Sequence, residues 1–116
     1  TLSSMLIDRD VTVSHLRVQP TFLSDAQWNH LHQLVDKVYD DFTRKLTDRF
    51  PLLTTAAMQL CLLIRLHFSN AQIATLTAVS PASVSQQKFR LKKRLLQMDD
   101  TLFKEGETVD MLIWSY

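Results

Sequence analysis

Residues 80–95 read SPASVSQQKFRLKKRL, and this stretch decides the fold to expect. Ser80 is a good helix N-cap, and Pro81 suits the first helical position because the N–H that proline lacks would be unpaired there. On a wheel of 100° per residue, the apolar side chains point one way. They are Val84, Leu91, Leu95 and Met98. The stretch therefore predicts a helix over residues 81–97 that is anchored in a core by one face.

The opposite face of this helix is uncharged near its start and basic further along. It carries Ser85, Gln86 and Phe89, with Arg90 and Lys93 around them. Gln can form a bidentate pair with adenine, Ser can donate or accept at a base edge, and an aromatic ring can touch a thymine methyl. Lys and Arg neutralise phosphates. This order is typical of a recognition helix, whose N-terminal side chains meet bases in the major groove.

A simpler interpretation of the same helix stays open. Positive residues near a helix C-terminus are stabilised by the helix dipole, so Lys92, Lys93 and Arg94 also fit a solvated helix end. Phe89 would then pack on the long helix predicted over residues 25–50.

The composition favours helices, and the positive and negative residues are unevenly distributed along the chain. With 116 residues, one domain is the default, and a single Gly and three Pro leave little material for tight hairpins. The net charge is only +1, but residues 49–98 contain no acid. They contain Arg49, Arg65, Lys88, Arg90, Lys92, Lys93 and Arg94. Every Asp, Glu, Lys or Arg position in the middle of the chain is therefore basic.

Apolar periodicity and capping residues predict further helices over 4–18, 25–50, 55–66, 70–77 and 107–115. A turn over Thr77–Val79 leads into Ser80. The contacts expected from the first helix are Leu6, Val13, Leu16 and Val18. No strand pattern competes, so we expect an all-α protein.

The helix predicted over residues 25–50 is long and amphipathic, with Ser24 as its N-cap and Pro51 after its end. Its apolar stripe recurs every three or four residues: Trp28, Leu31, Leu34 or Val35, Val38, Phe42, Leu46 and Phe50. A break near Tyr39–Asp41 is the alternative. The stripe suits either an intramolecular core or a dimer seam. Candidate interface anchors are Trp28, Phe42, Trp114 and Tyr116.

Other residue combinations argue against catalysis. His30 and His32 lie two apart and do not share a helix face, so we expect no metal site. Nothing suggests an oriented base for a Ser or Cys nucleophile. There is also no Gly-rich phosphate loop. We expect no enzyme, no cofactor and no small-molecule substrate.

The single Cys61 excludes an internal disulfide and fits a reducing compartment. The longest apolar run, Leu60–Ile64, is too short to span a bilayer, and no signal peptide is visible. We therefore expect a cytoplasmic protein. Because the chain begins at Thr1 without Met, we also expect it to be cut from something longer.

Residues 53–95 carry a series of residues at fixed offsets. They are Leu53–Thr54, Ser69–Asn70, Ile73–Ala74, Ser80 with Val84, and Arg94–Leu95. In this order they resemble the LuxR-type helix-turn-helix domain. The resemblance implies a DNA-binding domain over 51–98, a helical extension over 1–50 and a tail helix within 99–116.

The chain departs from this family's pattern at four positions. His67 and Ala78 stand where the family has Gly, Gln72 where it has an acid, and Thr77 where it has Leu. Non-Gly residues at positive φ are strained, although His tolerates it better than most residues. The departures leave an alternative open: a degenerate helix-turn-helix that serves as a helical protein–protein interaction or dimerisation module.

A wider resemblance covers roughly residues 22–116: a Trp-bearing helix, Phe42 with Leu46, Phe50–Pro51, and then the Leu-Thr domain. It is similar to the C-terminal output segment of large bacterial sensory regulators of transcription. The resemblance implies sequence-specific binding of double-stranded DNA, an upstream sensor and a place on the cytoplasmic side, where some such regulators are anchored to the membrane. A homodimer through 25–50 or the tail would pair two half-sites.

On this resemblance, the base-reading residues are Ser85, Gln86 and Phe89. The residues expected at the phosphates are Lys88, Arg90 and Lys93, to which the charge run adds Lys92.

Overall fold

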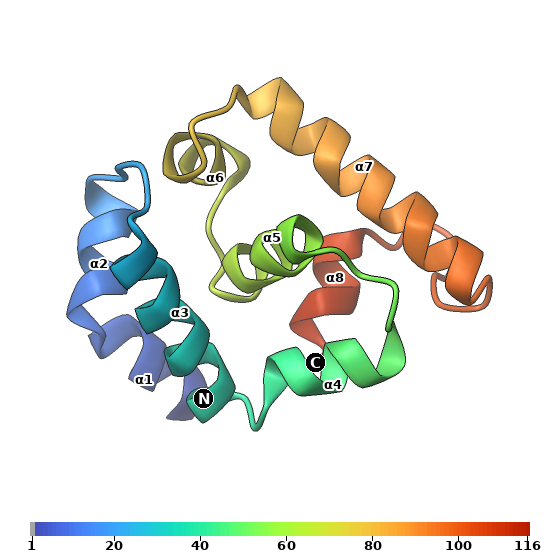
Figure 1. The fold of residues 1–116 in the computed structure, drawn as a ribbon, viewed down its shortest axis with the longest axis horizontal. Coiled ribbons are helices and arrows are strands. Elements are labelled where there is room, and N and C mark those ends of the chain that lie inside the picture. Colours follow the sequence, from blue (N-terminus) through green and yellow to red (C-terminus); the bar gives the residue numbers. More distant parts are fainter. Residues whose placement is uncertain (1) are drawn as a thin grey trace.

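The computed structural model describes the backbone of residues 2–116 and the side chains from Met5 onward. All regular secondary structure in that part of the chain is helical, which confirms the all-α prediction. The helices are α1 (Leu2–Arg9), α2 (Val11–Val18), α3 (Asp25–Val38), α4 (Phe42–Arg49), α5 (Thr55–Arg65), α6 (Asn70–Leu76), α7 (Pro81–Met98) and α8 (Val109–Trp114). In Figure 1, α5 lies at the centre, α1–α3 lie on one side of it, and α7 runs along the other.

One hydrophobic cluster joins all parts of the described chain. It includes Ile7 from α1, Leu31 from α3, Leu91 from α7 and Ile113 from α8. The residues of α5 from Leu60 to Ile64 are all buried, because this helix is apolar nearly all round and is enclosed by the others. The three segments expected from sequence therefore share a single core.

The helix predicted over residues 25–50 is two helices, α3 and α4, so the prediction of one long helix was wrong and its alternative break is correct. Asp40 and Asp41 both adopt left-handed backbone conformations, with φ of 50° and 57°. The carboxylate of Asp36 accepts hydrogen bonds from the backbone N–H of Thr43 (2.8 Å) and from its hydroxyl (2.7 Å). This carboxylate satisfies a backbone donor in the first turn of α4.

The break has a simple physical reason. At 1.5 Å per residue, a straight helix of that length would extend about 39 Å, longer than a small core can cover. Bending at Tyr39–Asp41 lets both halves of the apolar stripe face the same core. The core-facing members are fully buried: Leu31, Val35, Phe42, Leu46 and Phe50. The stripe is therefore an intramolecular packing surface.

The first predicted helix is also two helices, because Asp10 interrupts it and caps α2 by accepting from the backbone N–H of Val13 (3.0 Å). Val13 and Leu16 are buried as predicted, whereas Leu6 and Val18 are exposed. A hydrogen bond links α2 to the middle of the chain, because Arg17 donates to the backbone oxygen of Leu66 at 3.0 Å.

Two predicted strained positions are confirmed. His67, just after α5, has φ 62°, and Ala78, in the turn between α6 and α7, has φ 56°. Both stand where a Gly would adopt this conformation without steric cost. His67 stacks on Trp114 with ring centroids 4.8 Å apart, which gives its side chain a packing role.

Candidate nucleic-acid interface

The two helices α6 and α7 are joined by the short turn over Thr77–Val79 and pack against each other. Ser69 caps α6 with a reciprocal capping box that involves Gln72, and Ser80 caps α7 by accepting from the backbone N–H of Ser83. The N–H of Val79 donates to the oxygen of Ala74 at 2.9 Å and closes the turn. Local caps therefore set where both helices begin.

The core-facing side of α7 is as predicted. Val84, Leu91 and Leu95 are buried, and Met98 packs against the cluster while partly exposed. These contacts hold α7 by one face over most of its length. The opposite face of α7 is consequently turned to solvent.

The three residues expected to read bases all lie on this solvent face. Ser85 and Gln86 are exposed, and the Phe89 side chain is 68% exposed. Phe89 lies beside Asn70 of α6 and the C-terminal residues Thr108–Asp110, and it is not packed on residues 25–50, so that part of the simpler interpretation is wrong. The amide of Asn70, at the start of α6, donates to the hydroxyl of Ser85 at 3.3 Å. Sequence reasoning had not linked Asn70 to this face.

The four positive residues expected at phosphates divide into two pairs. Arg90 and Lys93 are exposed. Lys88 and Lys92 instead make contacts within the chain. Lys88 pairs with the Asp110 carboxylate at 2.9 Å, and its side chain is only 13% exposed.

Lys92 is held by the same C-terminal region. Its ammonium donates to the backbone oxygen of Glu107 at 2.6 Å and lies 4.8 Å from the centroid of the Phe103 ring. In this conformation Lys88 and Lys92 already have acceptors, in contrast to the free lysines that the charge run suggested. The sequence does contain a signal for this, since acids concentrate after Asp99, directly behind the basic helix.

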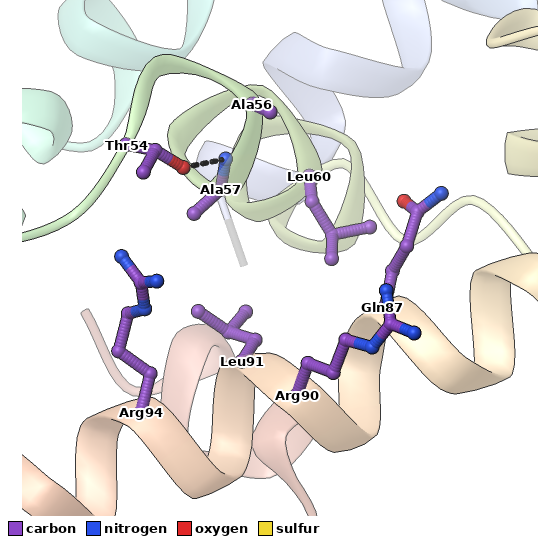
Figure 2. Close-up of a pocket in the computed structure, with 8 residues that line it drawn as sticks. All are labelled: Thr54, Ala56, Ala57, Leu60, Gln87, Arg90, Leu91 and Arg94. Carbon is purple, nitrogen blue, oxygen red and sulfur yellow. Dashed lines mark hydrogen bonds between the residues drawn. The ribbon is translucent and has the colours of Figure 1, made fainter.

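On the other flank of α7, facing α5, lies a groove of about 340 Å³. Its lining residues are Thr54, Ala56, Ala57, Leu60, Gln87, Arg90, Leu91 and Arg94. Figure 2 shows Leu91 between Arg90 and Arg94, with both guanidinium groups rising from α7 toward α5. Arg94 was not among the predicted site residues.

The candidate interface anchors are all used inside the chain. Phe42 is fully buried in the core, so it cannot anchor a partner in this fold. Trp28 packs against the core while partly exposed. The Trp114 indole N–H donates to the backbone oxygen of Ile64 at 2.9 Å. Tyr116 meets the Phe50 ring edge-on at 6.2 Å.

The remaining chemistry-bearing residues are separate from this face. Burial raises the pKa of the Cys61 thiol to about 12. His30 and His32 contact different carboxylates, those of Asp10 and Asp36. In the described part of the chain, no three His, Cys, Asp or Glu residues are grouped so that they could hold a metal ion. None of its helices combines the length and the apolar character needed to cross a membrane.

Comparisons with protein-family models, with curated proteins and with solved structures found no match for this chain.

Proposed function

We propose that this chain is the DNA-binding output segment of a bacterial transcription regulator and that α7 enters the major groove. One observation carries the proposal: α7 is anchored by one face and presents uncharged polar, aromatic and basic side chains on the other. Ser85, Gln86 and Phe89 come first, with Arg90 and Lys93 behind them. Side chains at the front of such a helix meet base edges, and cations behind them meet phosphates.

The order of elements supports the proposal. A short helix, a tight turn and a longer helix held by buried residues form the arrangement that helix-turn-helix proteins use. The net charge of the chain is only +1, but positive side chains are concentrated on α7. Such a local concentration of positive charge attracts a polyanion. On this proposal, Arg90 and Lys93 grip phosphate, and Lys88 and Lys92 join them only where the tail releases them.

The test is fluorescence anisotropy of a mixed-sequence duplex, titrated with the wild-type chain at several salt concentrations. We expect affinity to fall steeply as salt rises, because cations released from phosphates drive binding. The double variant Arg90→Ala/Lys93→Ala should lose most of this binding. The control Lys37→Ala/Arg44→Ala removes the same charge from exposed sites on α3 and α4 and should bind nearly as the wild type does. Equal losses in the two variants would refute a specific role for α7.

A second candidate function is a helical interaction module with a degenerate helix-turn-helix. It is favoured by one observation, namely that two of the four expected phosphate-binding side chains are engaged by the tail. Size-exclusion chromatography with light scattering, together with indifference to duplex DNA at low salt, would select this candidate.

A further inference from the structure

The flank of α7 that faces α5 differs from the flank that faces the tail. Arg90 and Arg94 both line the groove against α5, and no ion pair in the described part of the chain involves either residue. The hydrogen bond found for Arg94 is a long one, 3.4 Å, to the backbone oxygen of Leu52. The groove therefore has positive charge that no carboxylate neutralises.

The nearest acids in sequence are already engaged or lie outside the groove. No acid occurs between Asp48 and Asp99, and the Asp99 carboxylate bonds to Arg49 and to Thr101. Two uncompensated guanidinium groups beside one cavity attract an anion, and Arg favours phosphate because its planar donors match the oxygen geometry.

The floor of the groove is apolar. Ala57 and Leu60 of α5 face Leu91 of α7 across it (Figure 2). A ligand that fits must therefore combine an anionic group with an apolar surface. A phosphodiester has both, because the charged phosphate is flanked by the C–H groups of its sugars, and a volume near 340 Å³ suits a group of that size.

The position of the groove relative to the base-reading face favours the backbone of a bound duplex as the source of this phosphate. Gln86, Arg90 and Arg94 follow at intervals of four, so they form one row from the base-reading end of α7 to the groove. The major groove is about 12 Å wide and a helix about 10–12 Å across, so side chains on the flanks of an inserted helix meet the phosphates of the groove walls.

We propose that the groove between α5 and α7 binds one backbone phosphate of the duplex through Arg90 and Arg94. The sugar attached to this phosphate would contact Ala57, Leu60 and Leu91. This inference rests on the proposed function and extends it to Arg94 and to α5. Both guanidinium groups supply the charge. The opposite flank, where Asp110 and Glu107 hold the lysines, makes no equivalent contact.

The test compares two variants of one position, Ala57→Glu and Ala57→Gln. Both side chains suit the third position of a helix capped by Thr54, because Glu and Gln can each complete a capping box there. They differ only in charge at the groove. We expect Ala57→Glu to place a carboxylate beside Arg90 and Arg94 and to displace the phosphate.

The readout is the slope of log affinity against log salt for a mixed-sequence duplex. In Ala57→Glu and in Arg94→Ala the slope should fall by about 0.9, the value for one lost phosphate. Ala57→Gln occupies part of the sugar site without adding charge, so it should change the slope less than Ala57→Glu does. The control Lys37→Ala on α3 should keep the wild-type slope. Urea unfolding of each variant confirms that the fold is intact. If the wild type binds DNA and all variants share its slope, the groove between α5 and α7 binds no phosphate, and the proposed function stands. If the folded wild type does not bind DNA at low salt, both fail.

Discussion

The ammonium of Lys88 and the carboxylate of Asp110 form an ion pair of 2.9 Å between α7 and α8. Lys88 belongs to the basic helix and Asp110 to the acidic region that follows it. The second oxygen of Asp110 is buried and has no hydrogen-bond partner among the residues from Met5 onward. The tail thus lies against one flank of α7 through a nearly buried ion pair. This ion pair is on the flank away from the groove with α5.

Asp110→Asn tests this pair. Removing the charge leaves the Lys88 ammonium nearly buried beside a neutral group, so we expect the free energy of unfolding to fall by about 1–2 kcal/mol. If the proposed function holds, DNA affinity should rise, because an acid leaves the flank of α7. Urea unfolding and anisotropy measure the two effects. The control is Glu105→Gln, an exposed tail acid that forms no ion pair with the side chains the structure describes, and it should change stability by less than about 0.5 kcal/mol.

Gln86→Ala and Lys93→Ala should separate base reading from phosphate contact. Lys93→Ala should weaken binding to all duplexes and reduce the salt dependence, whereas Gln86→Ala should mainly relax base preference. Binding to a selected site and to a mixed-sequence duplex gives both quantities. The same loss of specificity in both variants would contradict this division of roles.

Ala78→Gly should stabilise the fold. Ala78 has φ 56° and is exposed, so Gly relieves strain there without removing packing. Gly also increases the entropy of the unfolded chain, which offsets part of the relieved strain. We therefore expect a net gain of about 0.5–1 kcal/mol in the free energy of unfolding. His67→Gly relieves the same strain but loses the stack on Trp114, so it should gain less. A larger gain from His67→Gly would show that the stack contributes nothing.

The stability should decrease on the acid side of neutrality through His67. Partial desolvation, and then the charges of Arg65 and Arg17, lower the pKa of His67 in the fold below its ordinary value of 6.5. Above that value His67 is neutral in both states and has no effect. As the pH falls through 6.5, the unfolded chain binds the proton first, so folding becomes less favourable.

The measurement is the melting temperature between about pH 8 and pH 5 for the wild type and for His67→Asn. Asn is chosen because it tolerates positive φ and does not titrate. We expect the wild type to lose more stability than the variant over this range. Parallel curves would rule out His67 as a source of the pH dependence.

Phe42→Ala should destabilise the fold of the chain without changing its oligomeric state. Phe42 is fully buried, and removing such a side chain costs about 3–5 kcal/mol. Phe22→Ala is a matched control, because Phe22 is 68% exposed and its removal should cost less than about 0.5 kcal/mol. Chemical unfolding gives the stabilities and light scattering the mass. A stable Phe42→Ala protein with altered mass would restore Phe42 as an interface anchor.

The helices and most of their ends could be predicted because their causes are local. Ser24, Thr54, Ser69 and Ser80 cap the helices expected to start there. Apolar spacing places Val84, Leu91 and Leu95 on one buried face of α7. These features depend on groups within about four residues of one another. The solvent exposure of Ser85, Gln86 and Phe89 follows from the same spacing.

The breaks and the charge partners required the fold. Nothing within a few residues forces the bend at Tyr39–Asp41. It arises because α3 and α4 must both cover a core that other helices complete. The partners of Lys88 and Lys92 come from residues 107–110, and the groove at Arg90 and Arg94 exists because α5 lies across from α7. Such pairings depend on the packing of segments far apart in the chain, which helix periodicity does not encode.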